Sequence, residues 1–108
     1  MAEVNRGEIW QFEFARPNKR RPVLILTRQD ILGHLHSVTV APITTTIRGI
    51  PSEVIIGAES GLKTISAINL DNVATVPKDK LRIFIGTVPL QIMMAVREAL
   101  LFALGFDG

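Results

Sequence analysis

The sequence predicts a single, mainly β domain: a closed or half-closed β-barrel that ends in an α-helix. Three observations support this fold class. The chain has 108 residues, which suffice for one domain over residues 1–108 and leave no room for a second. It contains at least five short apolar segments separated by turn-forming residues, a pattern typical of a small barrel. Its last apolar segment repeats at helical spacing instead.

The first two predicted strands flank a turn. Residues 8–14 alternate in character, so we expect a half-buried strand with Ile9 on its outer face. The inner face carries three aromatic side chains: Trp10, Phe12 and Phe14. A proline and an asparagine indicate a turn over residues 15–19. Residues 22–27 are apolar on both faces, which is typical of a central strand.

Further strands follow along the chain. Residues 38–46 are rich in β-branched side chains, but Pro42 interrupts the ladder and predicts a bulge or an edge position. Residues 53–56 form a short strand after a turn, and residues 65–76 alternate as one longer strand. After another turn, residues 81–85 have the pattern of a last short strand.

The C-terminal segment is the clearest helix. Thr87 or Val88 can cap it, Pro89 suits its first turn, and Gly105 ends it. The apolar side chains at helical spacing are Ile92, Met93, Val96, Leu100 and Ala103. Other apolar residues broaden this surface beyond one stripe, so we expect one side to pack on the sheet and the rest to contact a second copy in a homodimer.

Composition narrows the setting in which the chain works. At 47% hydrophobic residues it is apolar for its size, which also favours an oligomer. It has no cysteine, so disulfides and thiolate metal sites are excluded. The longest apolar run, residues 88–104, contains Arg97 and Glu98, and the first residues lack the apolar core of a signal peptide. We therefore expect no membrane span, and a reducing cytoplasm fits.

Positive charge is concentrated in one part of the chain. The formal net charge is only +2, yet one short segment holds five basic residues and no acid. These residues are Arg16, Lys19, Arg20, Arg21 and Arg28. Such a cluster points to a polyanion partner such as nucleic acid, and a solvated basic loop is the alternative.

Several chemistries are disfavoured because their motifs are missing. The sequence has no Gly-rich phosphate loop, no GxSxG motif and no cluster with metal-ligand spacing. We therefore expect neither a metal nor a cofactor. The two histidines, His34 and His36, could perform acid–base chemistry, but they fall in a predicted loop and are interpreted as surface residues.

A group of polar residues is the better candidate site. Arg21 stands at the start of a buried strand, where its guanidinium is anchored. Thr44 and Thr46 share one face at the end of the third strand, and Asp71 and Asn72 interrupt an apolar segment. An arginine beside hydroxyl groups can hold a phosphate through charge-assisted hydrogen bonds. Taken singly, each residue is equally explained by strand propensity or surface charge.

As an ordered set, these segments resemble the MazF/PemK family. The resemblance covers nearly the whole chain in the right order, and the order is more specific than any single motif. The matching segments are residues 6–10, 21–25, 38–45, 66–73 and 75–78, then positions 81, 85 and 86 and the C-terminal helix.

The resemblance implies a barrel of the SH3-like, CcdB/PemK type that works as a homodimer. It also implies a prokaryotic toxin that cleaves single-stranded RNA at short sequences without a metal. A cognate antitoxin silences such toxins by placing a disordered tail in the RNA groove. Matching positions make Arg21 and Thr44 the catalytic residues. The expected RNA-binding residues, including two from the basic segment, are Arg6, Lys19, Arg20, Ser66, Asp71 and Asn72.

Two departures from the family pattern affect RNA binding. The turn before Arg21 is short, whereas relatives often carry a longer Gly-rich loop there. Asp71 and Asn72 stand where relatives commonly have Glu and Gln, so base preference can differ. Trp10 could stack on a base, but a tryptophan that points inward from a strand is more often a core residue.

The chemistry is reasonable on its own terms. RNA carries its own nucleophile, the 2′-hydroxyl, so the protein must orient it, accept its proton and stabilise charge. Arg21 and Thr44 can donate hydrogen bonds to the phosphorane oxygens, giving a 2′,3′-cyclic phosphate and a 5′-hydroxyl. The general base stays open, because an arginine is effectively always protonated.

Two other functions remain as alternatives. One is a non-catalytic toxin of the same fold that resembles CcdB and poisons a gyrase; it needs no Arg–Thr pair. The other is an SH3-like module for Pro-rich peptides, which needs an aromatic groove. With no Tyr and only 6% aromatic residues, that groove is hard to build.

Overall fold

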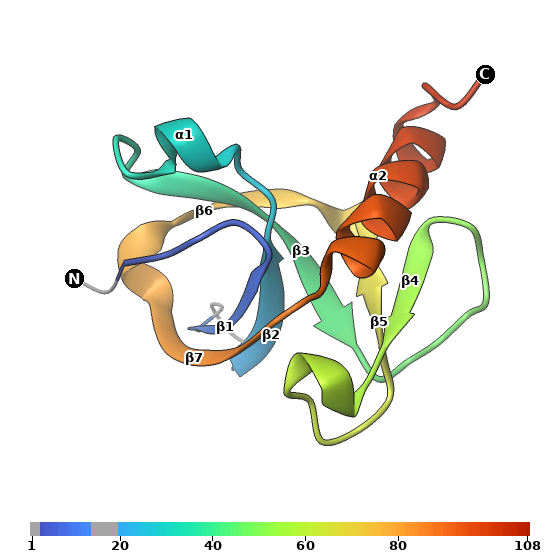
Figure 1. The fold of residues 1–108 in the computed structure, drawn as a ribbon, viewed down its shortest axis with the longest axis horizontal. Coiled ribbons are helices and arrows are strands. Elements are labelled where there is room, and N and C mark those ends of the chain that lie inside the picture. Colours follow the sequence, from blue (N-terminus) through green and yellow to red (C-terminus); the bar gives the residue numbers. More distant parts are fainter. Residues whose placement is uncertain (1–2, 14–19) are drawn as a thin grey trace.

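A computed structural model describes residues 3–13 and 20–108. Within them the chain forms seven strands, two helices and three short 3-10 turns (Figure 1). The strands are β1 (Glu8–Glu13), β2 (Arg20–Ile25), β3 (Ser37–Thr44), β4 (Glu53–Ile56), β5 (Ser66–Asn69), β6 (Ala74–Pro77) and β7 (Leu81–Thr87). The helices are α1 (Gln29–Leu32) and α2 (Leu90–Leu104), and the 3-10 turns are η1 (Ala58–Ser60), η2 (Leu70–Asn72) and η3 (Lys78–Lys80).

Every strand pairing is antiparallel, and β3 is the strand that joins the two parts of the sheet. The strand order is β4-β5-β3-β2-β1-β7, and β6 pairs with the first half of β3. The sheet curls so that β6 and β7, joined by η3, come round to the same side of the molecule (Figure 1). The predicted fold class, a half-closed barrel with a C-terminal helix, is confirmed.

Two apolar clusters lie on opposite faces of the curled sheet. The inner cluster includes Trp10, Phe12 and Val23, so the aromatic inner face predicted for β1 is confirmed at these positions. The outer cluster includes Ile9, which is 0% exposed. The prediction that Ile9 lies on the outer face of a half-buried strand missed this burial, because α2 and β4 cover the outer face. Phe14 and the turn predicted at 15–19 lie outside the described residues.

The single strand predicted over 65–76 is wrong. The chain breaks at η2, where the Asn69 side chain accepts a hydrogen bond from the Asp71 N–H at 2.9 Å. This turn separates β5 from β6, and both then pair along the same edge of β3. Pro42, which has no N–H to donate, lies between those two ladders, so the interruption predicted there is found without an edge strand.

Helix α2 packs against β4 and η2 on the outer face (Figure 1). Val96 and Ala99 are its buried residues, and Gly105 ends it in the left-handed conformation at φ 81°. The cap predicted at Thr87 or Val88 is wrong: the N-cap position is Pro89, with no side-chain cap. Among the described residues, no helix is long and apolar enough to span a membrane.

Candidate active site

A pocket of about 410 Å³ opens over one face of β3, where the inner face of the sheet reaches the surface. Val40, Pro42 and Thr44 are alternate residues of β3, so they share the face that forms its floor. The remaining lining residues come from β2, β4, β5, β6, η2 and the segment after β3: Arg21, Thr46, Arg48, Glu53, Asn69, Asn72 and Ala74. The pocket therefore gathers residues that are up to about 50 positions apart in the sequence, from Arg21 to Ala74.

Arg21 and Thr44 meet in this pocket. In the β2–β3 ladder Val23 pairs with Pro42, and continuing the same register by two residues places Arg21 opposite Thr44. Directly opposite residues of an antiparallel pair project from the same face and are close neighbours. The structure therefore brings Arg21 and Thr44 to one pocket, and their role as a phosphate site stays a prediction.

The Thr44 hydroxyl is set up to donate. Its Oγ1 accepts a hydrogen bond from the backbone N–H of Thr46 at 3.1 Å. That contact occupies an oxygen lone pair and leaves the hydroxyl proton able to point elsewhere, because a hydroxyl has one donor and two acceptor sites. Thr44 can therefore present a proton to an oxygen atom bound beside Arg21.

The opposite wall of the pocket is formed by Glu53 and the turn before it. Glu53 pairs with Asn69 across the β4–β5 ladder, and both residues line the pocket. The Glu53 Oε1 accepts hydrogen bonds from the backbone N–H groups of Arg48 and Gly49, at 3.0 and 2.9 Å. Gly49 has φ 73°, a conformation that favours glycine. The carboxylate thus fixes the turn that carries Arg48.

Sequence reasoning missed Arg48, Glu53 and Asn69 as site residues. The sequence does contain one signal: an acid at position 53, shortly after Arg48 and Gly49, can accept hydrogen bonds from the backbone of a turn. Even so, no periodicity places that turn against β3, so only the fold brings these residues to the pocket.

Of the two predicted neighbours in η2, Asn72 lines the pocket and Asp71 does not. The Oδ2 atom of Asp71 accepts a hydrogen bond from the Ser52 hydroxyl at 2.5 Å. Ser52 is buried, whereas Asp71 is exposed beside the pocket. This bond ties η2 to the residue that precedes β4 and holds Asn72 in place.

The other expected RNA-binding residues are not brought to the pocket. Arg6 precedes β1 at the end opposite the partner of Arg21, and its N–H donates to the Gln29 side chain at 2.7 Å. Ser66 is buried, and its hydroxyl donates to the Thr64 carbonyl at 2.8 Å. Arg20 is exposed next to Arg21 but is not part of the lining. Lys19 lies outside the described residues.

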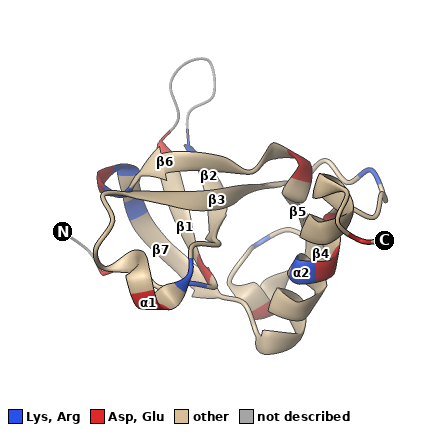
Figure 2. Cartoon of the chain, turned by 90° about the horizontal axis from the view of Figure 1, so that it is seen from above, with Lys and Arg blue, Asp and Glu red and all other residues tan. Residues whose placement is uncertain are grey.

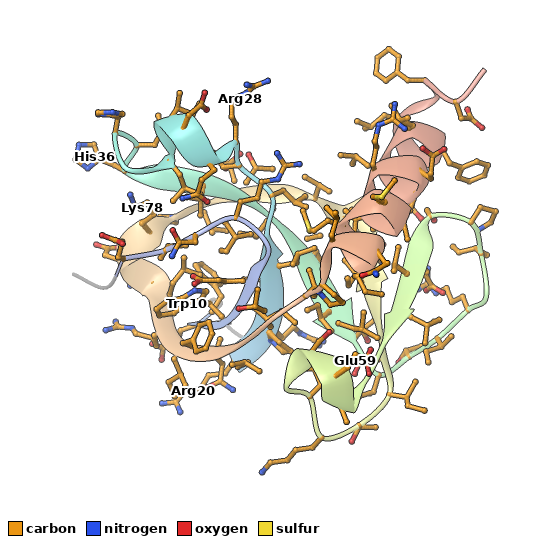
Figure 3. The ribbon with its side chains drawn as sticks, viewed as in Figure 1. Trp10, Arg20, Arg28, His36, Glu59 and Lys78 are labelled. Atoms are coloured by element: carbon orange, nitrogen blue, oxygen red, sulfur yellow. The ribbon has the colours of Figure 1, made fainter. Side chains whose placement is uncertain are left out.

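Trp10 is a core residue and the two histidines are surface residues, as predicted from the sequence. Trp10 is 6% exposed, packs edge-on against Phe84 and donates its ring N–H to Glu8 at 3.0 Å. His34 and His36 are exposed in the segment after α1. Figure 3 shows His36 near Lys78 and Arg28 at one end of the barrel, while Arg20 lies at the other end.

The pocket lining carries a net positive charge. Its ionisable lining residues are Arg21, Arg48 and Glu53, two cations against one acid. Figure 2 shows Lys and Arg on several elements, with the basic start of β2 lying beside the acidic end of β1. Within the part of the chain that the structure describes, no three His, Asp or Glu side chains gather as a metal site. The arrangement suits a phosphate diester, which carries one negative charge and several acceptor oxygens.

Comparison with known families gives one match over nearly the whole chain. Residues 5–104 match the family model of PemK-like, MazF-like toxins of type II toxin–antitoxin systems. The endoribonuclease MazF3 of Mycobacterium tuberculosis is 44% identical over 93 residues, which are 86% of this chain and 90% of that protein. The probable endoribonuclease MazF of Mycolicibacterium smegmatis is 34% identical over an alignment of 110 positions, which covers 97% of this chain and 100% of that protein.

Solved structures of toxins superpose on nearly the whole of this chain. The Mycobacterium tuberculosis toxin MazF-mt6 superposes with a TM-score of 0.86 at 40% identity, over 94% of this chain and 99% of that one. An endoribonuclease in complex with its cognate antitoxin, from a mycobacterial species, also gives 0.86, at 30% identity over 95% of this chain and 96% of that one. The half-closed barrel and its C-terminal helix are therefore a fold already known from toxins.

Proposed function

This chain belongs to the family of PemK-like, MazF-like toxins of type II toxin–antitoxin systems, and we propose that it is a single-domain endoribonuclease. It cleaves single-stranded RNA, be it mRNA, rRNA or tRNA, at specific short sequences and without a metal ion, and so inhibits translation and growth. The observation that carries the proposal is the placement of Arg21 opposite Thr44 in a pocket with net positive charge.

The cleavage follows from what these two side chains can do. The 2′-oxygen of the RNA forms a bond to phosphorus, and the bond from phosphorus to the 5′-oxygen breaks. Overall a proton passes from the 2′-hydroxyl to the departing 5′-oxygen. The products are a 2′,3′-cyclic phosphate and a 5′-hydroxyl end.

Arg21 and Thr44 stabilise the state in between. The planar guanidinium of Arg21 donates two parallel hydrogen bonds to non-bridging phosphate oxygens, and the Thr44 hydroxyl donates a third. These donors are fixed by the β2–β3 ladder and by the bond from the Thr46 N–H. A site fixed in advance stabilises developing charge without having to reorganise.

Sequence preference resides in the amide side chains of the pocket. Asn72 offers a donor and an acceptor toward an unstacked base, and Asn69 offers its N–H groups while its Oδ1 accepts from the Asp71 N–H. The Asp71 carboxylate can accept from an amino group beside them. Unstacked bases in single-stranded RNA expose their hydrogen-bonding edges, so these groups can discriminate between them.

Two protein partners complete the proposal. A relative has been solved as an endoribonuclease with its cognate antitoxin, and we extend such a partner to this chain. A homodimer is supported by apolar side chains left exposed on α2, namely Leu90, Met94 and Leu104. We also propose that the protein acts in the bacterial cytoplasm, where its RNA substrate is found. Light scattering at several protein concentrations tests the dimer: a monomer mass at all of them contradicts it.

The decisive experiment is cleavage of a long single-stranded RNA in excess EDTA. Wild-type protein, Arg21→Ala and Arg82→Ala are compared, the last as a charge control at an exposed arginine of β7 outside the pocket. Discrete fragments with 5′-hydroxyl ends from wild type and the control only support the proposal. Equal cleavage by Arg21→Ala rejects the assigned site. No cleavage of any RNA rejects the activity, and a gyrase-inhibition assay then tests the CcdB-like alternative.

A further inference from the structure

Arg48 is the second cation in the pocket, and the cleavage chemistry above makes no use of it. It lies in the segment between β3 and β4, where an exposed arginine would ordinarily sample many positions. Here the backbone at Arg48 is fixed, because its N–H and that of Gly49 both donate to one oxygen of Glu53. The N–H of Glu53 in turn donates to the Ile50 carbonyl at 3.0 Å and closes the turn.

The charge of Arg48 is not neutralised by the acid that holds its turn. Glu53 receives backbone N–H groups at Oε1, and among the described residues Arg48 forms no ion pair with any carboxylate. A guanidinium that lines a pocket with its charge uncompensated attracts an anion.

The position of this turn indicates which anion. Glu53 lies on β4, and β5 stands between β4 and β3, so Glu53 is about two strand spacings, roughly 10 Å, from the strand that carries Thr44. The Arg48 turn therefore forms the wall opposite the Arg21–Thr44 pair. When the Arg21–Thr44 pair holds one phosphate of the RNA, the opposite wall of the pocket stays open for the next phosphate along the RNA chain.

We propose that Arg48 binds the phosphate adjacent to the scissile phosphate of the RNA, and that Glu53 is the residue that positions Arg48. This inference rests on the proposed endoribonuclease function and adds to it a second phosphate subsite. The substrate that fills the pocket then includes two consecutive phosphodiesters. Arg48 contributes binding that is equal in the ground state and the transition state, since its phosphate does not react.

The first test measures binding with a substrate that cannot be cut. The probe is an RNA oligonucleotide spanning the mapped cleavage site, with a 2′-deoxy nucleotide at the scissile position. In a set of such probes, one phosphate at a time is replaced by a neutral methylphosphonate. Fluorescence anisotropy gives the dissociation constant of each probe for wild type, Arg48→Ala and the control Arg82→Ala.

Arg48→Ala is expected to weaken binding of the unmodified probe roughly tenfold or more, because it removes hydrogen bonds between charged groups. On the probe with the one adjacent phosphate neutralised, the same substitution should cost less than about twofold, since the two losses are the same interaction. The plot of log affinity against log salt should become less steep by about 0.7 for Arg48→Ala. Arg82→Ala should change none of these.

The second test separates positioning from chemistry at Glu53. Glu53→Gln keeps an oxygen that can accept both N–H groups, so it should bind and cleave within a few-fold of wild type. Glu53→Ala should lose the coupling to the adjacent phosphate, as Arg48→Ala does, with kcat changed less than KM. If Glu53→Gln loses activity as fully as Glu53→Ala, the carboxylate itself takes part in the reaction and the positioning role is rejected.

Other results overturn the subsite. Equal losses for Arg48→Ala on every probe show no specific phosphate partner, and coupling to the scissile phosphate places Arg48 with Arg21. If wild-type protein cuts no RNA, the proposed function fails and this inference with it. If wild type cuts RNA but Arg48→Ala shows no coupling, only this inference fails.

Discussion

Arg21 and Thr44 line the same pocket, at positions that the register of the β2–β3 ladder, continued by two residues beyond Val23 and Pro42, places opposite each other. The two residues come from strands that pack their other positions into the core, Val23 on β2 and Ala41 on β3 among them. Burial of those neighbours fixes the register, because a slip of one residue would turn every side chain to the wrong face. The geometry of the Arg–Thr pair is therefore set by hydrophobic packing and not by the pair itself.

Arg21→Lys should reduce cleavage strongly, although less than Arg21→Ala. Lysine keeps the charge but cannot donate two parallel hydrogen bonds from a planar group. We expect kcat to fall by about 10²-fold for alanine and by more than about tenfold for lysine. Single-turnover cleavage of a short RNA measures both, and a lysine variant as fast as wild type would show that charge alone is required.

Thr44→Val should reduce cleavage, whereas Thr44→Ser should retain it. Valine has the shape of threonine without the hydroxyl, so it loses the donor and leaves the Thr46 N–H without its acceptor. We expect kcat to fall by about 10²-fold for valine and to stay within a few-fold for serine. The valine variant should lose only about 1 kcal/mol of unfolding free energy. Urea unfolding measures this loss, and a much larger one would attribute the lost activity to misfolding.

Gly86→Ala should destabilise the fold strongly, although position 86 lies outside the pocket. A Cβ added at Gly86 would lie 2.2 Å from the carbonyl oxygen of Ser60, so η1 and β7 would have to move apart. We expect a loss of about 2 kcal/mol or more, a decrease in Tm of roughly 10 °C. The matched control is Gly33→Ala, where a Cβ meets nothing within 4 Å. Equal Tm values for the two variants would contradict the close contact.

Ser52→Ala should change which RNA sequences are cut more than how fast they are cut. The Ser52 hydroxyl donates to Asp71, and this bond holds η2 with Asn72 at the edge of the pocket. Its loss should cost about 1 kcal/mol of stability, near 5 °C in Tm, and broaden the cleavage motif. Sequencing of fragment ends compares the variant with Ser37→Ala, at an exposed serine. An unchanged motif would mean that η2 does not read bases.

The strands and the final helix could be predicted because each depends on local periodicity. The observed β4 has the predicted bounds, β1 begins at the predicted residue, and β2 and β3 differ from their predicted bounds by two residues or fewer at each end. The break at η2 could not be predicted in the same way. Asn69, Leu70 and Asp71 alternate like strand residues, and only the side-chain bond from Asn69 to the Asp71 N–H shows the turn.

The residues of the candidate site also fall into two groups: those that the sequence predicted and those that only the folded chain reveals. The β class and the terminal helix could be predicted from the sequence, and an ordered resemblance pointed to Arg21 and Thr44 as the catalytic residues. Only the packing of the folded chain shows that Arg48 and Glu53 line the same pocket as Arg21 and Thr44, while Arg6 and Ser66 lie elsewhere. Periodicity reports which face a residue occupies within its own strand. Which strands become neighbours, and in what register, depends on burying two apolar clusters at once, and that is a property of the whole chain.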